Sequence, residues 1–355
     1  RDHRNRQGVC GSSGPLNGLG VWEVKKEYIL YFDSGTSNTR AYLLDREFRI
    51  CDSAKRAVGS KDSAIAGTNR VLIEGMKALY DQVLAANSLT DGDVEAIYAS
   101  GMVTSPYGLK EVPHLVLPMT VRDFADSLYP FHEDTCFHRD IFLVPGLKTL
   151  SDDFSFVNNL RGEEIEIIGA LEELKAERDV ENVVMLMPGS HTHGIYIQGD
   201  QITGIISNFT GELFYALKQD TILSPVLTSD SLELDEAMVR KGIENLERFG
   251  FNRALYICHA MRIFEQGTPQ QRLSYGESVI MGGVRQSLEY YCEHFWKECR
   301  TVALVSDEFM YRLFSMILEG SRYIDRIIWM PISDGKSYGV SGLKKIVSLK
   351  GERHE

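Results

Sequence analysis

Apolar and polar residues follow one another in short blocks near the start of the chain. An apolar run at 28–32 leads into small polar residues at 33–39, and a second apolar run follows at 41–44. Two such runs around a small polar turn are typical of a tight β-hairpin. The turn offers hydroxyls and backbone N–H groups, with Asp33 at its entrance. These groups suit phosphate oxygens and a magnesium ion, so a phosphate-binding hairpin and an ordinary polar hairpin are equally good interpretations.

The pattern after this hairpin alternates between predicted strands and predicted helices. Apolar residues recur at three- and four-residue steps over 66–88, which predicts a helix. A shorter helix is predicted at 120–129, and short apolar runs predict strands at 48–52, 97–102 and 141–146. The order of hairpin, strand, helix, strand, helix and strand indicates an α/β domain.

The same arrangement recurs in the second half of the chain. A helix predicted at 163–175 precedes a second apolar run, polar turn and apolar run over 183–198, and a strand follows at 201–206. Helices are then predicted at 211–218, 230–247, 253–265 and 274–297, a strand–turn–helix unit at 301–319, a strand at 327–330 and a closing segment at 339–348.

Two hairpins with small polar tips, about one domain apart, indicate an internal duplication. We expect two domains, over 27–160 and 161–355, that face each other so that both tips reach one cleft. A phosphate chain in that cleft would be bound from two sides. Residues 1–26 are rich in Gly, Ser and charged residues and lack the apolar core of a signal peptide. We expect this extension to be disordered.

Composition narrows the class of protein. The chain has 355 residues, 43% of them hydrophobic and 25% charged, as in soluble globular proteins. A net charge of −12 argues against nucleic acid or anionic membranes as main partners. The six cysteines form no CxxC pair, which favours reduced thiols in the cytoplasm over a disulfide framework or zinc site. No run approaches the roughly 18 apolar residues of a membrane span.

Six short segments carry a resemblance to a known family. They lie at 33–41, 100–103, 144–147, 160–164, 188–192 and 209–214. As a set and in this order they resemble the 2-dehydro-3-deoxygalactonokinase family, within the superfamily of sugar kinases, actin and heat-shock chaperone ATPases. The resemblance runs from about residue 28 to about residue 345. It implies two related ribonuclease-H-like domains, of the actin-type ATPase kind, with a nucleotide cleft between them.

The resemblance also implies an activity. Members transfer the γ-phosphoryl group of ATP, with Mg²⁺, to the primary 6-hydroxyl of a 2-keto-3-deoxy sugar acid, a cytoplasmic step in galactonate catabolism. The epimer is left open by the sequence, because selectivity at one hydroxyl depends on sub-ångström placement of polar groups. A homodimer is the default expectation for the oligomeric state.

The resemblance assigns roles to particular residues. Asp33 is the expected Mg²⁺ ligand, and Glu163 or Glu164 is the expected catalytic base. Phosphate and nucleoside contacts are expected from Ser34, Gly35, Thr36, Ser37, Asn38, Pro188, Gly189, Ser190, His191 and Ser306. Substrate contacts are expected from Arg40, Gly101, Met102, Arg161, Thr210 and Glu212. Structural alternatives exist for each, such as turn capping by Asp33 and helix-dipole stabilisation by the two glutamates.

Two segments depart from the family pattern. After His191 the family has Ser-Lys-Trp, whereas this chain has residues 192–194, Thr-His-Gly, and so lacks a cation. His193 would replace that charge only at mildly acid pH. Ser306 and Asp307 stand where the superfamily commonly has Gly. These departures keep two alternatives open: a nucleotide- or sugar-acid-binding sensor that has lost catalysis, and a divergent ATPase with a protein partner.

Overall fold

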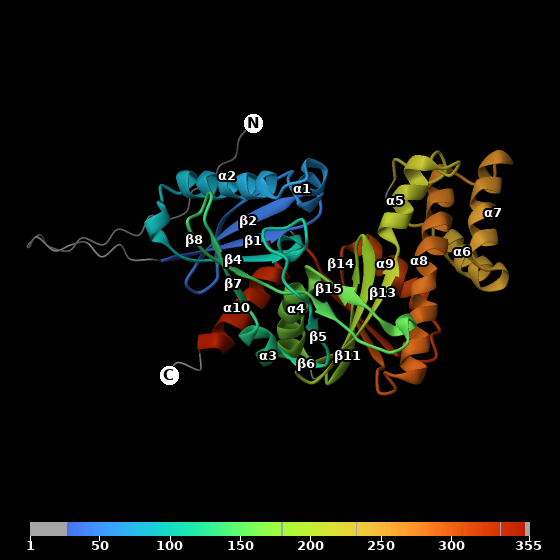
Figure 1. The fold of residues 1–355 in the computed structure, drawn as a ribbon. Coiled ribbons are helices and arrows are strands. Elements are labelled where there is room, and N and C mark those ends of the chain that lie inside the picture. Colours follow the sequence, from blue (N-terminus) through green and yellow to red (C-terminus); the bar gives the residue numbers. More distant parts are fainter. Residues whose placement is uncertain (1–26, 179, 232, 334, 352–355) are drawn as a thin grey trace, which may run out of the picture.

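The computed structural model describes residues 27–178, 180–231, 233–333 and 335–351 (Figure 1). The extension at 1–26 lies outside the described residues. Two six-stranded sheets dominate the molecule, with helices on their outer faces and further helices between them. The predicted two-part α/β architecture is confirmed. Within the described residues, no helix combines the length and apolar character needed to cross a membrane.

The first sheet has the strand order β3-β2-β1-β4-β8-β7. Its strands are β1 (Tyr28–Ser34), β2 (Thr39–Asp45), β3 (Ile50–Arg56), β4 (Val94–Gly101), β7 (Tyr129–Glu133) and β8 (Arg139–Leu143). β1 and β2 form the predicted hairpin, and β1 is parallel to β4. The strand predicted at 48–52 begins later, at Ile50, because Phe48 adopts a positive φ of 62° in the turn before it.

Two helices cover the outer face of this sheet. They are α1 (Ser60–Ala66) and α2 (Arg70–Ala86), so the single helix predicted at 66–88 is wrong at its start. Gly67 ends α1 in the left-handed conformation, with φ of 67°, a conformation that glycine adopts at little cost. Leu30 and Phe32 of β1 pack with Leu72 of α2 in one buried cluster.

The second sheet has the strand order β15-β14-β11-β12-β13-β6. Its strands are β6 (Met119–Thr120), β11 (Asn182–Pro188), β12 (His191–Gln198), β13 (Gln201–Phe209), β14 (Thr301–Ser306) and β15 (Arg326–Pro331). β11 and β12 form the predicted second hairpin. A small third sheet joins β5 (Leu115–Val116), β9 (Leu147–Lys148) and β10 (Asn159–Leu160). Because β6 comes from the first half of the chain, that half contributes an edge strand to the second sheet.

Three helices lie between the two large sheets (Figure 1): α3 (Val121–Asp126), α4 (Glu163–Glu177) and α10 (Tyr338–Gly351). One buried cluster joins Tyr31 of the first sheet, Ile168 of α4 and Met185 of the second sheet. α4 and α10 cross in close contact, because a Cβ at Gly342 would lie 1.9 Å from the carbonyl oxygen of Ile165. This crossing fixes where α4 begins relative to the first hairpin.

Two of the remaining α-helices, α8 (Pro269–His294) and α9 (Glu308–Leu318), pack on the second sheet, and α5 (Gly211–Asp220) contacts β12. Two more, α6 (Glu236–Phe249) and α7 (Phe251–Ile263), pack against α8 on its side away from the sheet (Figure 1). The predicted helix at 274–297 begins earlier, at Pro269, because Thr268 caps it and Pro269 occupies its first turn. The prediction at 230–247 begins too early, since Asp235 caps α6.

Candidate active site

A row of polar side chains crosses the first sheet at the hairpin end. Strand register pairs Asp33 with Ser100 on one side and with Arg40 on the other, and pairs Arg40 with Lys55. Directly paired residues point to the same face of a sheet. Arg40 and Lys55 both lower the pKa of Asp33, although its burial, which raises the pKa, has the larger effect. Lys55 was not predicted from the sequence, because its place in this row depends on the pairing of β2 with β3.

The first hairpin tip contacts Gly59 and the start of α1 on one side and is exposed to solvent on the other. Gly35 donates its N–H to the carbonyl of Asn38 (2.8 Å), and Lys61 in α1 donates to the carbonyl of Thr36 (2.9 Å). A Cβ at Gly59 would lie 2.4 Å from that same carbonyl oxygen, so only glycine allows this approach. Residues 35–38 are all exposed. These four predicted phosphate-binding residues therefore sit together on a supported, accessible turn.

Ser34 differs from the rest of the predicted loop. Its side chain is buried, and its hydroxyl is hydrogen-bonded to that of Thr39 at 2.9 Å. Thr39 in turn donates to the carbonyl of Val58. The Ser34 hydroxyl thus forms a buried hydrogen bond between the two strands of the hairpin and is not exposed at its tip.

The second hairpin tip, Pro188 to His191, is supported by the start of α5. A Cβ at Gly211 would lie 2.2 Å from the carbonyl oxygen of Gly189, and Glu212 donates its N–H to the carbonyl of Ser190 (2.8 Å). The glycine at 211 therefore lets α5 begin directly against the turn.

Two residues predicted to contact the substrate belong to this support. The hydroxyl of Thr210 is buried and hydrogen-bonded to that of Thr192 (2.9 Å). The carboxylate of Glu212 lies 3.4 Å from Nε2 of His191. Thr210 and Glu212 thus contact residues of the second hairpin.

Two glycines bring the start of α4 to the first sheet. Gly101 has φ of 87° and Gly162 has φ of 121°, both outside the range that other residues usually adopt. A Cβ at Gly101 would lie 2.4 Å from the carbonyl oxygen of Ser34, and one at Gly162 would lie 3.5 Å from the Cα of Gly101. The first turn of α4 consequently lies beside the ends of β1 and β4, and its carboxylates come near Asp33.

Glu163 and Glu164 have different surroundings. Glu164 is fully buried, and its Oε2 accepts the N–H of Gly162 at 2.7 Å. Burial, followed by the charge of Glu163, raises the pKa of Glu164 well above its usual value. The side chain of Glu163 is 32% exposed, and its Oε1 lies 3.9 Å from Nε2 of His193 in the second hairpin. Burial raises the pKa of Glu163 too, and Asp33 adds to the rise.

Glu166 is a third carboxylate in this group and was missed from the sequence. Burial, then the charges of Asp33 and Glu163, raise its pKa to about 8, while Arg40 opposes the rise. Glu163 and Glu166 are three residues apart in α4 and so share one helix face. That spacing was visible in the sequence, but only Glu163 and Glu164 belong to the segment at 160–164 that carries the resemblance.

We expect Glu166→Gln to stabilise the metal-free, ligand-free protein at pH 8. When a carboxyl has a higher pKa in the folded state than in the unfolded state, the free energy of unfolding falls as pH rises from the unfolded-state pKa to the folded-state pKa. For Glu166 that window runs from about pH 4.5 to about 8, at no more than ~1.4 kcal/mol per pH unit. Urea unfolding at pH 4.5, 6 and 8 in EDTA would measure the effect.

Glu172→Gln serves as the control for this prediction, because Glu172 lies on the same helix but pairs with Lys345 (2.9 Å) near the surface. The interpretation fails if Glu166→Gln and wild type keep a constant stability difference across this pH range.

Arg161 is committed to contacts within the protein. Its guanidinium donates to the carbonyls of Thr104 (2.7 Å) and Val112 (3.1 Å) and contacts the ring of His114. Burial, followed by the charge of Arg161, lowers the pKa of His114 to about 4. Arg161 therefore holds the segment after Gly101 and Met102 against the start of α4, and its terminal nitrogens face protein acceptors.

The prediction that His193 carries a positive charge at mildly acid pH is wrong. Its side chain is buried, its Nδ1 is hydrogen-bonded to the hydroxyl of Ser207 (2.9 Å), and burial lowers its pKa to about 4. The imidazole stays neutral at mildly acid pH, so it does not replace the missing lysine charge.

The carboxylates suit a weakly ligated magnesium ion. Within the described residues, no three His, Cys, Asp or Glu side chains are grouped closely enough to form a complete metal cage. Mg²⁺ commonly takes only one or two protein carboxylates and completes its shell with water and phosphate oxygens. Oε2 of Glu163 and Oε1 of Glu164 are buried without a hydrogen-bond partner. Asp33, with Glu163 nearby, fits such a site.

Ser306 lies at the same edge of the second sheet as the second hairpin tip. The adjacent strands β11, β14 and β15 are parallel. Pro188 ends β11 and Ser306 ends β14, so both residues lie at the carboxyl ends of neighbouring strands. The Ser306 side chain is buried, and its hydroxyl donates to the carbonyl of Asp307 (3.0 Å). Asp307 caps α9 by accepting the N–H of Met310 (2.8 Å).

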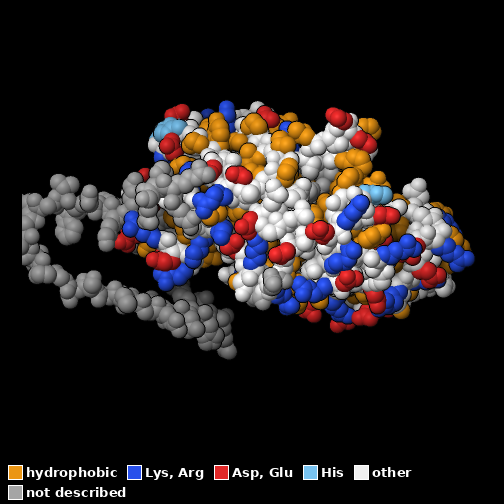
Figure 2. Space-filling model, turned by 90° about the horizontal axis from the view of Figure 1, so that it is seen from below, with side chains coloured by type: hydrophobic (Ala, Val, Ile, Leu, Met, Phe, Trp, Pro, Cys, Tyr) orange, Lys and Arg blue, Asp and Glu red, His pale blue; other side chains and the backbone are white. Residues whose placement is uncertain are grey.

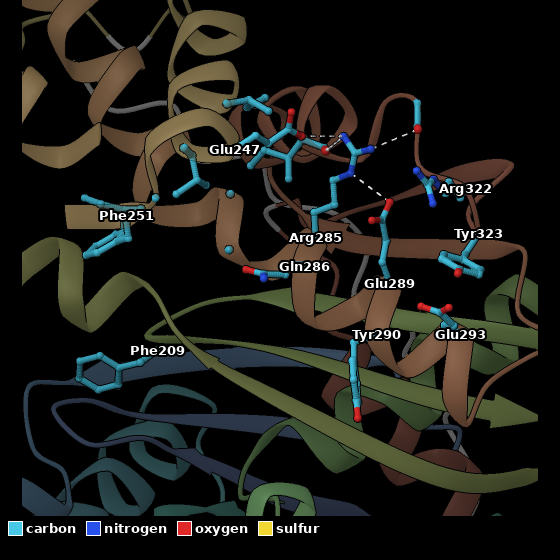
Figure 3. Close-up of a pocket in the computed structure, with 18 of the residues that line it drawn as sticks. Phe209, Glu247, Phe251, Arg285, Gln286, Glu289, Tyr290, Glu293, Arg322 and Tyr323 are labelled. Carbon is cyan, nitrogen blue, oxygen red and sulfur yellow. Dashed lines mark hydrogen bonds and ion pairs between the residues drawn. The ribbon is translucent and has the colours of Figure 1, made fainter. Parts of the chain in front are cut away.

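Two cavities differ in their relation to the predicted site residues. A cavity of about 720 Å³ extends from Arg40 and Lys55 to Lys336, in the segment between β15 and α10. Another, of about 1110 Å³, lies among α6, α8 and the end of α9 (Figure 3). None of the site residues predicted from the sequence lines this second cavity, and its Arg285 is bonded to Glu289 and to backbone carbonyls. The first cavity is lined by Arg40, the strand partner of Asp33.

One face of the described residues carries charges of both signs. Figure 2 shows Asp and Glu side chains among the Lys and Arg side chains over the described part of one face. That face carries no extended basic area, consistent with the net charge of −12.

Comparison with known proteins gives concordant results. A family model described as 2-keto-3-deoxy-galactonokinase matches residues 33–328. A Rhizobium meliloti (strain 1021) protein named "Probable 2-dehydro-3-deoxygalactonokinase DgoK1" is 27% identical over 197 residues, 56% of this chain and 58% of that protein. The Escherichia coli (strain K12) 2-dehydro-3-deoxygalactonokinase is 27% identical over 193 residues, 54% of this chain and 56% of that protein. The chain thus spans little more than half the length of these curated relatives.

The same comparison extends to solved structures. A Sinorhizobium meliloti crystal structure described as a "putative 2-dehydro-3-deoxygalactonokinase protein" superposes with a TM-score of 0.72 at 20% sequence identity. The superposition covers 92% of this chain and 99% of that one. At this identity the likeness establishes a shared fold.

Proposed function

We propose that this chain, which belongs to the 2-keto-3-deoxy-galactonokinase family, transfers the γ-phosphoryl group of ATP to the 6-hydroxyl of a sugar acid. The substrate we assign is 2-dehydro-3-deoxygalactonate or a close relative. The observation that carries the proposal is the meeting of Asp33, the start of α4 and the second hairpin. Glu163 lies within electrostatic reach of Asp33 and 3.9 Å from His193. We also assign 27–160 and 161–355 as the two domains, each built around one large sheet.

The two hairpin tips would bind the phosphate chain. Exposed hydroxyls and N–H groups at 36–38 suit the oxygens of one end, and the turn at Gly189 and Ser190 suits the other. Asp33 would hold Mg²⁺ through one carboxylate oxygen or a water. When bound, the ion neutralises charge on the transferring phosphoryl group. Arg40, paired with Asp33, adds a cation on the same face.

Glu163 is our choice for the base. The 6-hydroxyl oxygen forms a bond to the γ-phosphorus, the bond from that phosphorus to the bridging oxygen breaks, and ADP leaves. The hydroxyl proton passes to the carboxylate of Glu163. A raised pKa suits this role, because the best proton acceptor has a pKa near the working pH. Glu164 is fully buried and bonded to Gly162, so it is better suited to shaping the helix start.

Binding of the sugar-acid carboxylate falls to other groups. The terminal nitrogens of Arg161 face protein acceptors, whereas Arg40, the strand partner of Asp33, and Lys55 line the cavity of about 720 Å³. We propose that these two cations receive the carboxylate and that residues 101–104, held by Arg161, form the opposite wall of the substrate site.

A ligand-binding sensor is the second candidate. The neutral His193 favours it, since no cation replaces the lysine of the second loop there. The two functions predict different results in one assay.

We expect ADP release to require Mg²⁺, ATP and a 2-keto-3-deoxy sugar acid together. A coupled assay over a panel of such acids, with the corresponding sugars lacking the carboxylate as controls, would measure it. Phosphorus NMR of the product would identify the phosphorylated hydroxyl. Thermal stabilisation by ATP and sugar acid without ADP release would overturn the kinase proposal in favour of the sensor.

A further inference from the structure

The cavity of about 720 Å³ is lined by positive charge in a protein that is acidic as a whole. Its cations are Arg40 and Lys55, from the first sheet, and Lys336, from the segment between β15 and α10. None of the described residues that line it is Asp or Glu, although the chain has a net charge of −12. Three cations around one space repel one another unless an anion lies between them. The cavity is therefore suited to an anionic ligand.

Lys336 is bonded to a carboxylate that does not line this cavity. Its Nζ donates to Oε1 of Glu173 in α4 at 2.5 Å and lies 4.6 Å from the centre of the Tyr338 ring. The side chains of Lys336 and Glu173 are each 32% exposed. An ion pair that is this exposed contributes little to stability, because water competes for both groups. Exchange of Glu173 for another carboxylate therefore costs little.

The cavity extends away from the proposed reaction centre. Arg40 pairs with Asp33 across the first hairpin, whereas Lys336 contacts Glu173, which lies ten residues, or about 15 Å of helix, beyond Glu163. In a six-carbon sugar acid the carboxylate is at the end opposite the 6-hydroxyl. The arrangement matches an acid whose carboxylate enters the cavity while its 6-hydroxyl stays near Glu163.

We propose that Lys336 binds the carboxylate of the sugar acid together with Arg40 and Lys55, and that it gives up Glu173 to do so. This inference rests on the proposed kinase function, which brings a sugar acid to this site. The lysine ammonium is a point charge on a flexible stem, so it reorients from one carboxylate to the other.

The bound carboxylate then connects the two halves of the protein. Arg40 and Lys55 belong to the first sheet, and Lys336 follows the last strand of the second. A neutral sugar makes no such connection, so the binding energy of the carboxylate is available only to acids. Lys336 is in this way a residue that selects acids over neutral sugars.

Initial rates at saturating ATP and Mg²⁺, over a series of sugar-acid concentrations, test this assignment. Lys336→Met is expected to raise the KM for the sugar acid about tenfold or more, since a hydrogen bond between charged groups is lost, and to change kcat less than KM. The preference for the acid over the corresponding neutral sugar should fall by a similar factor. Glu173→Gln is expected to lower the KM about two- to fivefold, because it removes the carboxylate that competes for Lys336.

Lys345→Met is the matched control, because Lys345 also pairs with a glutamate of α4, Glu172 (2.9 Å), and does not line this cavity. It should keep the wild-type KM. A purely structural ion pair would make Lys336→Met and Glu173→Gln change the KM in the same direction. That result, or a wild-type KM in Lys336→Met, overturns the inference while the kinase function stands.

Two further outcomes are decisive. A wild type that phosphorylates no sugar acid overturns the kinase function and this inference together. If Lys336→Met does not fold, Glu173→Gln decides alone: a lowered KM supports the exchange of carboxylates, and an unchanged or raised KM overturns it.

Discussion

Glu163→Gln is expected to lower kcat for sugar-acid phosphorylation by about 10²–10⁴-fold, the usual contribution of a positioned general base. Gln keeps the size of the side chain and its helix position but accepts no proton. Affinity for ATP should change little, because Glu163 acts on the sugar hydroxyl. Single-turnover kinetics with saturating ATP and sugar acid would isolate the chemical step from binding.

Glu164→Gln provides the comparison one residue away. Its carboxyl is fully buried and bonded to Gly162, so we expect turnover to stay within about tenfold of wild type. A loss of turnover confined to Glu164→Gln would reverse the assignment of the base. Retention of more than a tenth of wild-type kcat by both variants would show that neither glutamate is the base.

Asp33→Asn is expected to lower kcat by about 10²–10³-fold or more and to weaken the dependence of rate on Mg²⁺ concentration. Asn keeps the geometry at the end of β1 but loses the charge that binds the ion. The same change should stabilise the ligand-free protein at pH 7. Burial raises the pKa of Asp33 in the folded state, so the ionised carboxylate costs stability above the unfolded pKa, and that cost disappears below it. Initial rates over a Mg²⁺ series and a thermal melt would measure both effects.

Asp45→Asn is the control at the other end of the hairpin. Asp45 accepts the N–H of Arg49 at 2.9 Å and pairs with its side chain at 2.6 Å. This variant should lose stability, by about 1 kcal/mol, and retain turnover. If Asp33→Asn behaves as Asp45→Asn does, then Asp33 is a turn-capping residue and the proposed metal site is wrong.

The local features of this site were predictable from the sequence. Each hairpin is specified by two short apolar runs and the turn residues between them, and the start of α4 by an acidic first turn after Gly162. Turn chemistry and helix periodicity involve residues close together in the chain, so one segment suffices to predict them. The break between α1 and α2 was also signalled, by Gly67, but the helical pattern on either side obscured it.

Side-chain orientation was much harder to predict. Ser34, in the first hairpin, and Thr210, before α5, are polar residues, yet both are buried, with their hydroxyls bonded to Thr39 and Thr192. Glu163 and Glu164 are adjacent, and roughly 100° of helix rotation separates them. Only the packing of α4 against the first sheet places one near His193 and buries the other.

By itself, then, the sequence determined the two hairpins, the acid at the entrance of the first and the acidic start of α4, because each depends on neighbouring residues alone. The tertiary structure decided which groups meet. Strand register brought Lys55 into a row with Asp33. The approach of Gly162 to Gly101 brought Glu166 to the same site. These meetings depend on contacts between residues far apart in the chain, and a local pattern carries no information about register or packing angle.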